Sequence, residues 1–165
     1  MSKDLVLQGA HVSHGMIRIN LDGVSHEDSL RTAGENGNCI NWILGHIVTY
    51  RGRVVEKLGG SQFLSSDEVD LYSRGSAGIS AMTNGVADLS KLSSLLEESM
   101  KSLRDLIREM TAEQLAESVG AESFPVPVKD TSLGAWLNFM QLHEAYHAGQ
   151  IGIVRRALGK KGKIG

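Results

Sequence analysis

The sequence is poor in cysteine and has no long apolar run, and each shortage excludes a class of protein. Its one cysteine, Cys39, has no second cysteine with which to form an internal disulfide. No apolar stretch approaches the roughly 18 residues of a membrane-spanning helix. The N-terminal residues MSKDLVLQGAHVSHG lack the continuous apolar core of a signal peptide. These absences predict a protein of the reducing cytoplasm that does not enter a membrane.

An excess of charge of either sign is also missing. The chain has 17 basic and 19 acidic side chains and a formal net charge of -2 at pH 7. The basic residues are spread among acidic ones except in the terminal stretch RRALGKKGKIG, which argues against nucleic acid as a partner. With 165 residues, the chain is long enough to fold around one core without disulfides. We therefore expect a single domain over residues 1–165.

Proline is confined to Pro125 and Pro127, so most of the chain is free of the strongest helix breaker. Apolar residues recur at spacings of three and four, which predicts an all-α protein with long helices at about residues 4–21, 38–58, 88–110 and 132–158. A capping box of Thr111 and Gln114 predicts a short helix after the third. Residues 59–85, rich in glycine and serine, are predicted to form a long loop. The expected architecture is a four-helix bundle with a long crossover connection between its second and third helices.

Residues 143–147 read HEAYH and fit the H-E-x-x-H pattern, in which two histidines one helical turn apart bind zinc and the glutamate acts as a base. In the fourth predicted helix, His143 and His147 share a face with apolar residues, so both rings would point into the bundle. Side chains four residues apart are close enough to reach one ion. The alternative is a pair of core histidines whose ring nitrogens bind other protein groups.

A metalloprotease of the common type also has a ligand well downstream of this motif. No His, Asp, Glu or Cys follows His147, so any third ligand must come from upstream and a protease is disfavoured. The upstream candidates are His11, His14, His26 and His46. Of these, His46 lies on a distinctive strip of the second helix with Trp42, Tyr50 and Arg53. A surface histidine beside a tryptophan is the other interpretation of His46, and His11 and His14 have lower priority.

Several stretches together resemble the DinB-like (damage-inducible-protein-like) metal-binding four-helix bundles of bacteria. The stretch NCINWILGHIVTYR is similar to the family's second-helix signature, in which Leu-Gly-His follows a tryptophan. The stretch LHEAYHAGQIGIVRRALGK is similar to its fourth-helix signature, and LYSRGSA and TAEQL are similar to other segments of members. The resemblance covers most of the chain. It implies one divalent metal ion held by His46, His143 and His147, and a homodimer.

Three neutral imidazoles leave an ion its full double charge and an open position, as in catalytic zinc sites. Imidazole suits Zn, Ni, Fe and Co alike, and such an ion lowers the pKa of a bound water or thiol. Some relatives are similar to transferases that use a low-molecular-weight thiol such as mycothiol or bacillithiol. We therefore expect a metal-dependent enzyme of the thiol-dependent S-transferase type that acts on a small electrophile. The alternatives are a non-catalytic metal- or ligand-binding bundle and a metal-dependent hydrolase.

Further polar residues are candidates for supporting roles. Glu144 lies about 80° from the direction that bisects the two histidines of the motif, so it is either a base near the metal or a polar flank, and the flank is preferred. Gln150, one turn past the second histidine, could orient a ligand or the substrate, or form a core hydrogen bond. Tyr50, Arg53 and Arg155 could receive an anionic thiol or substrate, although a helix-surface arginine is usually a solvated charge.

Overall fold

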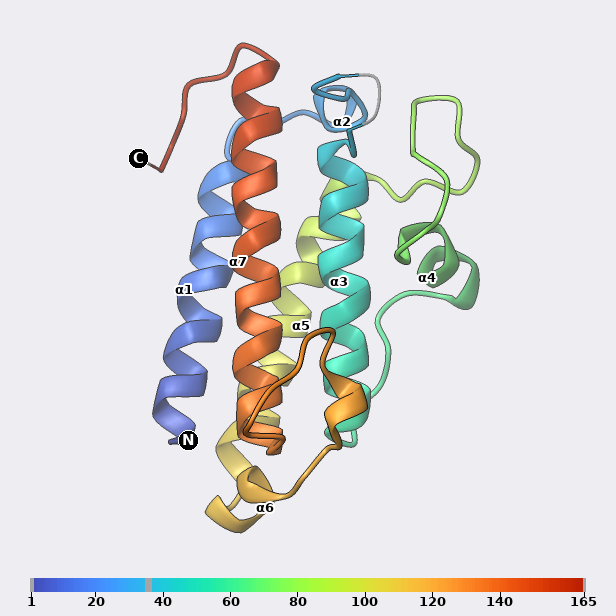
Figure 1. Cartoon of the computed structure of the whole chain (residues 1–165). Coiled ribbons are helices and arrows are strands. Elements are labelled where there is room, and N and C mark those ends of the chain that lie inside the picture. The colour runs from blue at the N-terminus through green and yellow to red at the C-terminus, as the bar shows by residue number, and fades with distance from the viewer. Residues whose placement is uncertain (1, 35–36, 165) are drawn as a thin grey trace.

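Four long helices form the body of the protein (Figure 1). The computed structural model describes residues 2–34 and 37–164. The long helices are α1 (Lys3–Leu21), α3 (Ile40–Lys57), α5 (Leu89–Glu109) and α7 (Leu133–Ala157), and their ends differ from the predicted ones by at most two residues. Helices α1 and α7 run in one direction and α3 and α5 in the other, so each packs beside one parallel and one antiparallel neighbour. The described residues contain no strand, and the predicted all-α class is confirmed.

The crossover from α3 to α5 is not the uninterrupted loop that the sequence pattern predicts. It contains α4 (Ser66–Tyr72), which begins with a capping box of Ser65 and Glu68. Another unpredicted short helix, α2 (His26–Ser29), also begins with a capping box. Helices this short have too few turns to produce a recognisable apolar period. The predicted short helix after α5 is present as α6 (Ala112–Ala116), and it begins with the expected capping box of Thr111 and Gln114.

Two apolar clusters fill the bundle, one toward each end. In α3, for example, Ile47 and Val48 belong to one cluster and Val54 and Val55 to the other. Between the clusters, every long helix contributes buried polar side chains, and we call this set the polar layer: Ser13, His14, Arg51, Ser99 and Glu144. None of the described helices combines the length and the apolar character that crossing a bilayer requires.

Candidate metal-binding site

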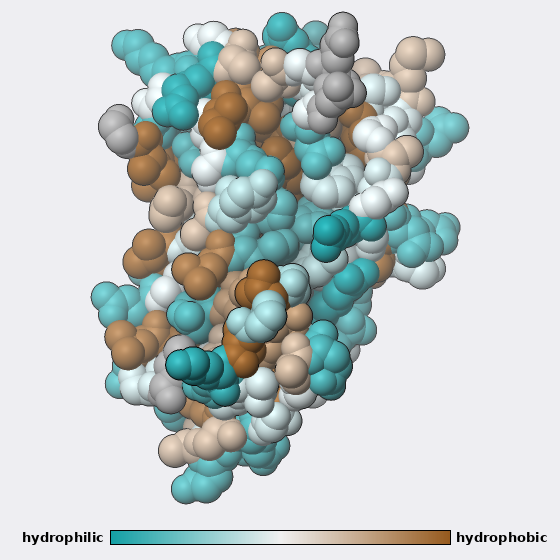
Figure 2. Space-filling view, in the orientation of Figure 1, coloured by the Kyte–Doolittle hydropathy of each residue, from teal (hydrophilic) through white to brown (hydrophobic). Residues whose placement is uncertain are grey.

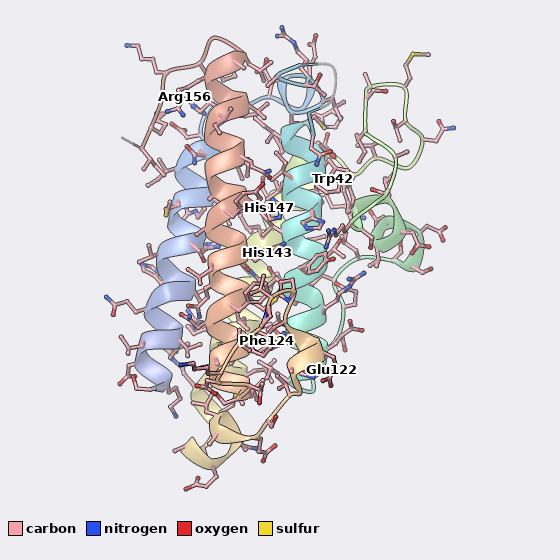
Figure 3. All side chains as sticks on the ribbon, in the orientation of Figure 1. Trp42, Glu122, Phe124, His143, His147 and Arg156 are labelled. Carbon is pink, nitrogen blue, oxygen red and sulfur yellow. The ribbon has the colours of Figure 1, made fainter. Side chains whose placement is uncertain are left out.

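Three histidines converge between the antiparallel neighbours α3 and α7. His46 comes from α3, and His143 and His147 come from adjacent turns of α7 (Figure 3). Each ring offers one nitrogen, and these nitrogens lie within 4.8 Å of one another. The Nε2 atoms of His143 and His147 are 3.0 Å apart. This separation is close to the roughly 3.3 Å between two ligands of a tetrahedral ion with bonds of about 2.0–2.1 Å.

Hydrogen bonds at the far side of two of these rings set their tautomers. The Nδ1–H of His46 donates to the backbone carbonyl of Tyr72 over 2.8 Å. The Nδ1–H of His147 donates to Oε1 of Gln150 over 2.7 Å, while Nε2 of Gln150 donates to the hydroxyl of Tyr146 over 3.0 Å. Each bond leaves the Nε2 of its histidine as a bare acceptor that faces the other rings. Metal-ligating histidines commonly have such a partner on the second nitrogen.

Burial keeps the three imidazoles neutral. Desolvation is the largest cause in each case, and it lowers the pKa of His46 and of His143 to about 4. It also lowers the pKa of His147. Neutral imidazole is the form that binds a metal ion. The Nδ1 atom of His143 is buried and has no hydrogen-bond partner in the described part of the chain, which is an exception to the rule for buried polar atoms.

The LYSRGSA segment, residues 71–77, includes the end of α4 and closes one side of the site. Gly45, which precedes His46, lies so close to the ring of Tyr72 that a Cβ atom there would overlap it. The Tyr72 hydroxyl donates to Oδ1 of Asn41 over 3.0 Å. A second hydrogen bond joins the same two segments, in which Nε1 of Trp42 donates to Oγ of Ser76 over 2.9 Å. The LYSRGSA segment is therefore fastened to α3, and its backbone supplies the acceptor for His46.

A cavity of about 380 Å³ opens beside two of the histidines. One wall comes from the 117–132 segment, whose ends are held together by hydrogen bonds from Val119 N to Thr131 O (2.9 Å) and from Leu133 N to Glu117 O (2.7 Å). Figure 3 shows Phe124 and Glu122, on this segment, in front of the lower part of the bundle. The lining residues are His46, Tyr50, Arg53, Arg74, Glu122, Ser123, Phe124, Pro125, Trp136, Phe139, Met140 and His143.

Glu144 is not the polar flank that the sequence pattern favours. It is buried, and its carboxylate accepts from Nε of Arg51 over 2.8 Å and from Nη2 over 2.7 Å. Ser13 also donates to it over 3.0 Å. Glu144 thus belongs to the polar layer, and both of its oxygens are engaged there. The sequence pattern did not single out Arg51. The feature that could have indicated its burial is that it is a basic residue within the apolar stripe of α3.

The other predicted site residues divide into two groups. Gln150 contacts a histidine of the cluster, and Tyr50 and Arg53 line the cavity. Arg155 is not brought to the histidines. Its guanidinium donates to the carbonyl of Asn20 over 3.0 Å and to that of Lys161 over 2.8 Å, so it joins the end of α1 to the C-terminal segment.

The three remaining histidines are not part of the cluster. His11 is exposed on α1, and His14 belongs to the polar layer. His26 accepts from the backbone N–H of Leu89, at the start of α5, over 3.2 Å. The sequence pattern did not single out Arg74, Phe124 or Phe139 as cavity residues. Arg74 lies in the LYSRGSA stretch, which stands out in the sequence only for its resemblance to family members and not for a role in a cavity.

The fold and the histidine cluster together define an all-α protein of four long helices with a site compatible with metal binding. The sequence model of the DinB superfamily matches residues 16–151, and the chain belongs to this superfamily. Its fold is similar to that in the crystal structure of a conserved protein from Enterococcus faecalis, with a TM-score of 0.71 over 97% of this chain and 99% of that one. At 16% sequence identity, this likeness shows the fold alone. No curated protein matches the sequence.

Proposed function

We propose that His46, His143 and His147 bind one divalent transition metal ion, and that the protein is a metal-dependent enzyme of the thiol-dependent S-transferase type that acts on a small electrophile. The observation that carries the metal assignment is the convergence of three neutral ring nitrogens within 4.8 Å. Two of the rings are already oriented through their other nitrogen. Zn, Ni, Fe and Co all suit such a donor set.

The protonation of the rings supports a cation at this point. Because Nδ1 of His147 donates to Gln150, its Nε2 is a bare acceptor that faces Nε2 of His143 at 3.0 Å. Without an ion, the His143 ring must place its proton on Nε2 to avoid opposing two lone pairs. In the described part of the chain its buried Nδ1 has no hydrogen-bond partner with or without an ion, so it is the facing pair of Nε2 atoms that favours a cation. A cation would let both Nε2 atoms act as ligands.

An ion with an open position would lower the pKa of a bound thiol or water enough to supply a nucleophile near neutral pH. The chain's own residues then bind and orient the reactants. His46 and His143 line the cavity, so a reactant next to them would lie beside the ligand set. Tyr50 and Arg53, on the same face of α3, offer a hydroxyl and a cation for an anionic thiol or substrate.

The position of Glu144 favours a thiol over water as the nucleophile. A hydrolase of the H-E-x-x-H type uses this glutamate as a base beside the metal. Here both oxygens of Glu144 are held by Arg51 in the polar layer. A thiol whose pKa an ion would lower below neutral would give its proton to solvent, and so would not depend on a carboxylate in that place. The thiol transferase is therefore preferred to the hydrolase.

Metal analysis of the purified protein tests the site. After reloading with Zn, Ni, Fe or Co and desalting, the wild type should retain about one ion per chain and His147→Ala much less. His11→Ala removes an exposed histidine and should retain the ion. Gln150→Leu should weaken affinity by about 10- to 100-fold, since it removes the group that orients a ligand. Equal and negligible metal in wild type and His147→Ala would refute the site.

An activity screen then separates the enzyme from a binding module. The metal-loaded protein is assayed with glutathione, bacillithiol and mycothiol against common small electrophiles. Transfer that needs both the metal and a thiol would support the proposal. Metal retention with no turnover for all three thiols would instead favour a bundle that binds a metal or a ligand without catalysis.

We also propose that the protein is a homodimer. Large apolar side chains are exposed along the side of the molecule where α1 and α7 lie next to each other (Figure 2). They are between 47% and 64% exposed, and comprise Leu5, Val12, Ile19, Leu142, Tyr146 and Ile153. Exposed apolar area of this kind is typical of protein contacts. Light scattering should give the mass of a dimer, and Leu142→Glu with Ile153→Glu should give that of a monomer. A monomeric wild type would exclude the dimer.

A further inference from the structure

We propose that the cavity beside His46 and His143 binds an amphipathic carboxylate, whose apolar body packs on an aromatic wall and whose carboxylate binds Arg53 and Arg74. This ligand would be the electrophilic substrate. The assignment to a reaction rests on the proposed function, whereas the binding itself does not. The residues that line the cavity include both the aromatic side chains and the two arginines.

An apolar wall occupies one side of the cavity. Trp136, Phe139 and Met140 come from α7, and Phe124 comes from the 117–132 segment. Phe124 and Trp136 are each only 9% exposed, and the rings of Phe124 and Phe139 lie 6.0 Å apart at 58° to each other. Aromatic side chains held in this way provide a firm surface for an apolar or aromatic group. Predominantly apolar lining with a few polar groups is typical of small-molecule sites.

Two arginines bring positive charge to the same cavity. Within the described ranges, no carboxylate lies within the 4.0 Å of an ion pair from Arg53 or Arg74. The Arg53 guanidinium lies over the ring of Tyr50, 4.6 Å from its centroid, and its Nη2 donates to Oγ of Ser73 over 3.0 Å. These contacts hold Arg53 in place while its other N–H groups stay available. A planar guanidinium matches a carboxylate with paired hydrogen bonds.

The charge balance selects an anion over a cation. The cavity lining holds two arginines and one carboxylate, that of Glu122, so its formal charge is 2 - 1 = +1 with neutral histidines. The Glu122 carboxylate is close to the backbone of Gly120, where a Cβ atom would overlap it. An ammonium group would face two arginines for one glutamate. A single carboxylate is therefore the head group that this lining fits best.

The spacing along α3 sets the length of the ligand. Arg53 follows His46 by seven residues, which corresponds to roughly 10 Å of helix rise. A carboxylate at Arg53 can therefore have its other end beside the histidines if the body is about one ring and a short chain long. The cavity volume of about 380 Å³ is in the range of small-ligand sites.

Calorimetric titration with four related compounds tests the head group and the body separately. Phenylpropionate, phenylpropanol and phenylpropylamine share a ring and differ in charge, and propionate lacks the ring. We expect phenylpropionate to bind at least about tenfold more tightly than the other three, since it alone makes both kinds of contact. Equal binding of the alcohol, or preferred binding of the amine, would overturn the proposal.

Variants assign the preference to residues. Arg53→Gln with Arg74→Gln should reduce the advantage of the carboxylate over the alcohol to about twofold or less. The same change at Arg31 and Arg108, which are exposed elsewhere, should keep it. Phe139→Leu should weaken phenylpropionate and leave propionate unaffected. Mercaptopropionate distinguishes the two reactants: if it binds through the arginines and phenylpropionate does not, they serve the thiol and the proposal is wrong.

Titrations of metal-free and zinc-loaded protein separate this proposal from the metal site. A carboxylate preference that persists without metal and depends on the arginines supports the proposal, even if metal analysis refutes the three-histidine site. A preference that appears only with zinc and survives in the Arg53→Gln, Arg74→Gln variant would show that the ion binds the carboxylate. That result would overturn the role of the arginines and leave the metal site intact.

Discussion

Replacement of Glu144 by glutamine should destabilise the protein far more than a surface substitution of the same kind. The change removes the charge that balances Arg51 and turns an amide N–H₂ toward a guanidinium. The side chain of Arg51 is 0% exposed and that of Glu144 is 8% exposed, so water cannot replace the lost partner. Arg51 would keep one hydrogen bond to the amide oxygen that replaces a carboxylate oxygen, its bonds to Leu96 O (3.0 Å) and Ser99 Oγ (3.4 Å), and its 3.4 Å contact with His14 Nδ1. None of these groups neutralises its charge.

Breaking a buried ion pair by removing one partner typically costs about 3–5 kcal/mol of unfolding free energy. A domain of this size has an unfolding free energy of about 5–15 kcal/mol, so about a fifth or more of it would be lost. At about 2–4 °C per kcal/mol, the melting temperature should fall by about 6–20 °C. Urea unfolding at pH 7, followed by far-UV circular dichroism, measures the free energy, and Glu98→Gln on the exposed face of α5 is the matched control.

A double-mutant cycle checks that the cost comes from the pair. Arg51→Met combined with Glu144→Leu replaces both charges by apolar groups, and should cost at least about 2 kcal/mol less than the sum of the single changes. Glu144→Gln should still bind one metal ion per chain, because its carboxylate contacts none of the three histidines through a hydrogen bond. This reasoning would be refuted if Glu144→Gln lowered the unfolding free energy by less than about 1 kcal/mol, or if the two single changes were additive. It would also be refuted if Glu144→Gln lost the metal ion without losing stability.

Two further predictions concern backbone space and pH. Gly45→Ala should cost about 1–3 kcal/mol, because its Cβ would displace the ring of Tyr72. Gly149→Ala, whose Cβ would meet nothing within 4 Å, should instead stabilise α7 by about 0.5–1 kcal/mol in urea unfolding; a loss for both would contradict the assignment. In the folded protein the pKa of His46 and of His143 is lowered from 6.5 to about 4. Between these pH values the unfolded chain takes up protons that the folded chain does not. The metal-free protein should therefore lose stability as the pH falls from 6.5 toward 4. Urea midpoints at pH 7 and pH 5 measure this, and His143→Ala should reduce the difference; an unchanged difference would argue against a neutral His143.

Periodic features of the chain could be predicted from sequence, and single long-range contacts could not. Apolar spacing located all four long helices, and the i to i+4 spacing brought His143 and His147 together. His46 was one of four candidates from residue spacing alone, and the family resemblance selected it. The reason is that the distance between a residue of α3 and one of α7 depends on how the bundle closes, which no local pattern records.

The polar layer shows where local patterning gives the wrong expectation. Charged residues are mostly exposed, so the sequence pattern does not single out Arg51 and favours a flanking position for Glu144. Their burial becomes understandable only as a pair, because each supplies the charge and the hydrogen bonds that the other needs. The same limit applies to Phe124, since its place at the cavity follows from the path of the 117–132 segment.

The acceptor for His46 is a main-chain carbonyl, whereas the acceptor for His147 is a side chain. Any amino acid at position 72 carries that carbonyl, so a substitution of Tyr72 changes where the acceptor lies and never whether it exists. A substitution of Gln150 can delete the acceptor altogether. The two halves of the site therefore respond to mutation in different ways: the half on α3 is sensitive to the shape of the crossover segment, and the half on α7 to the identity of one residue.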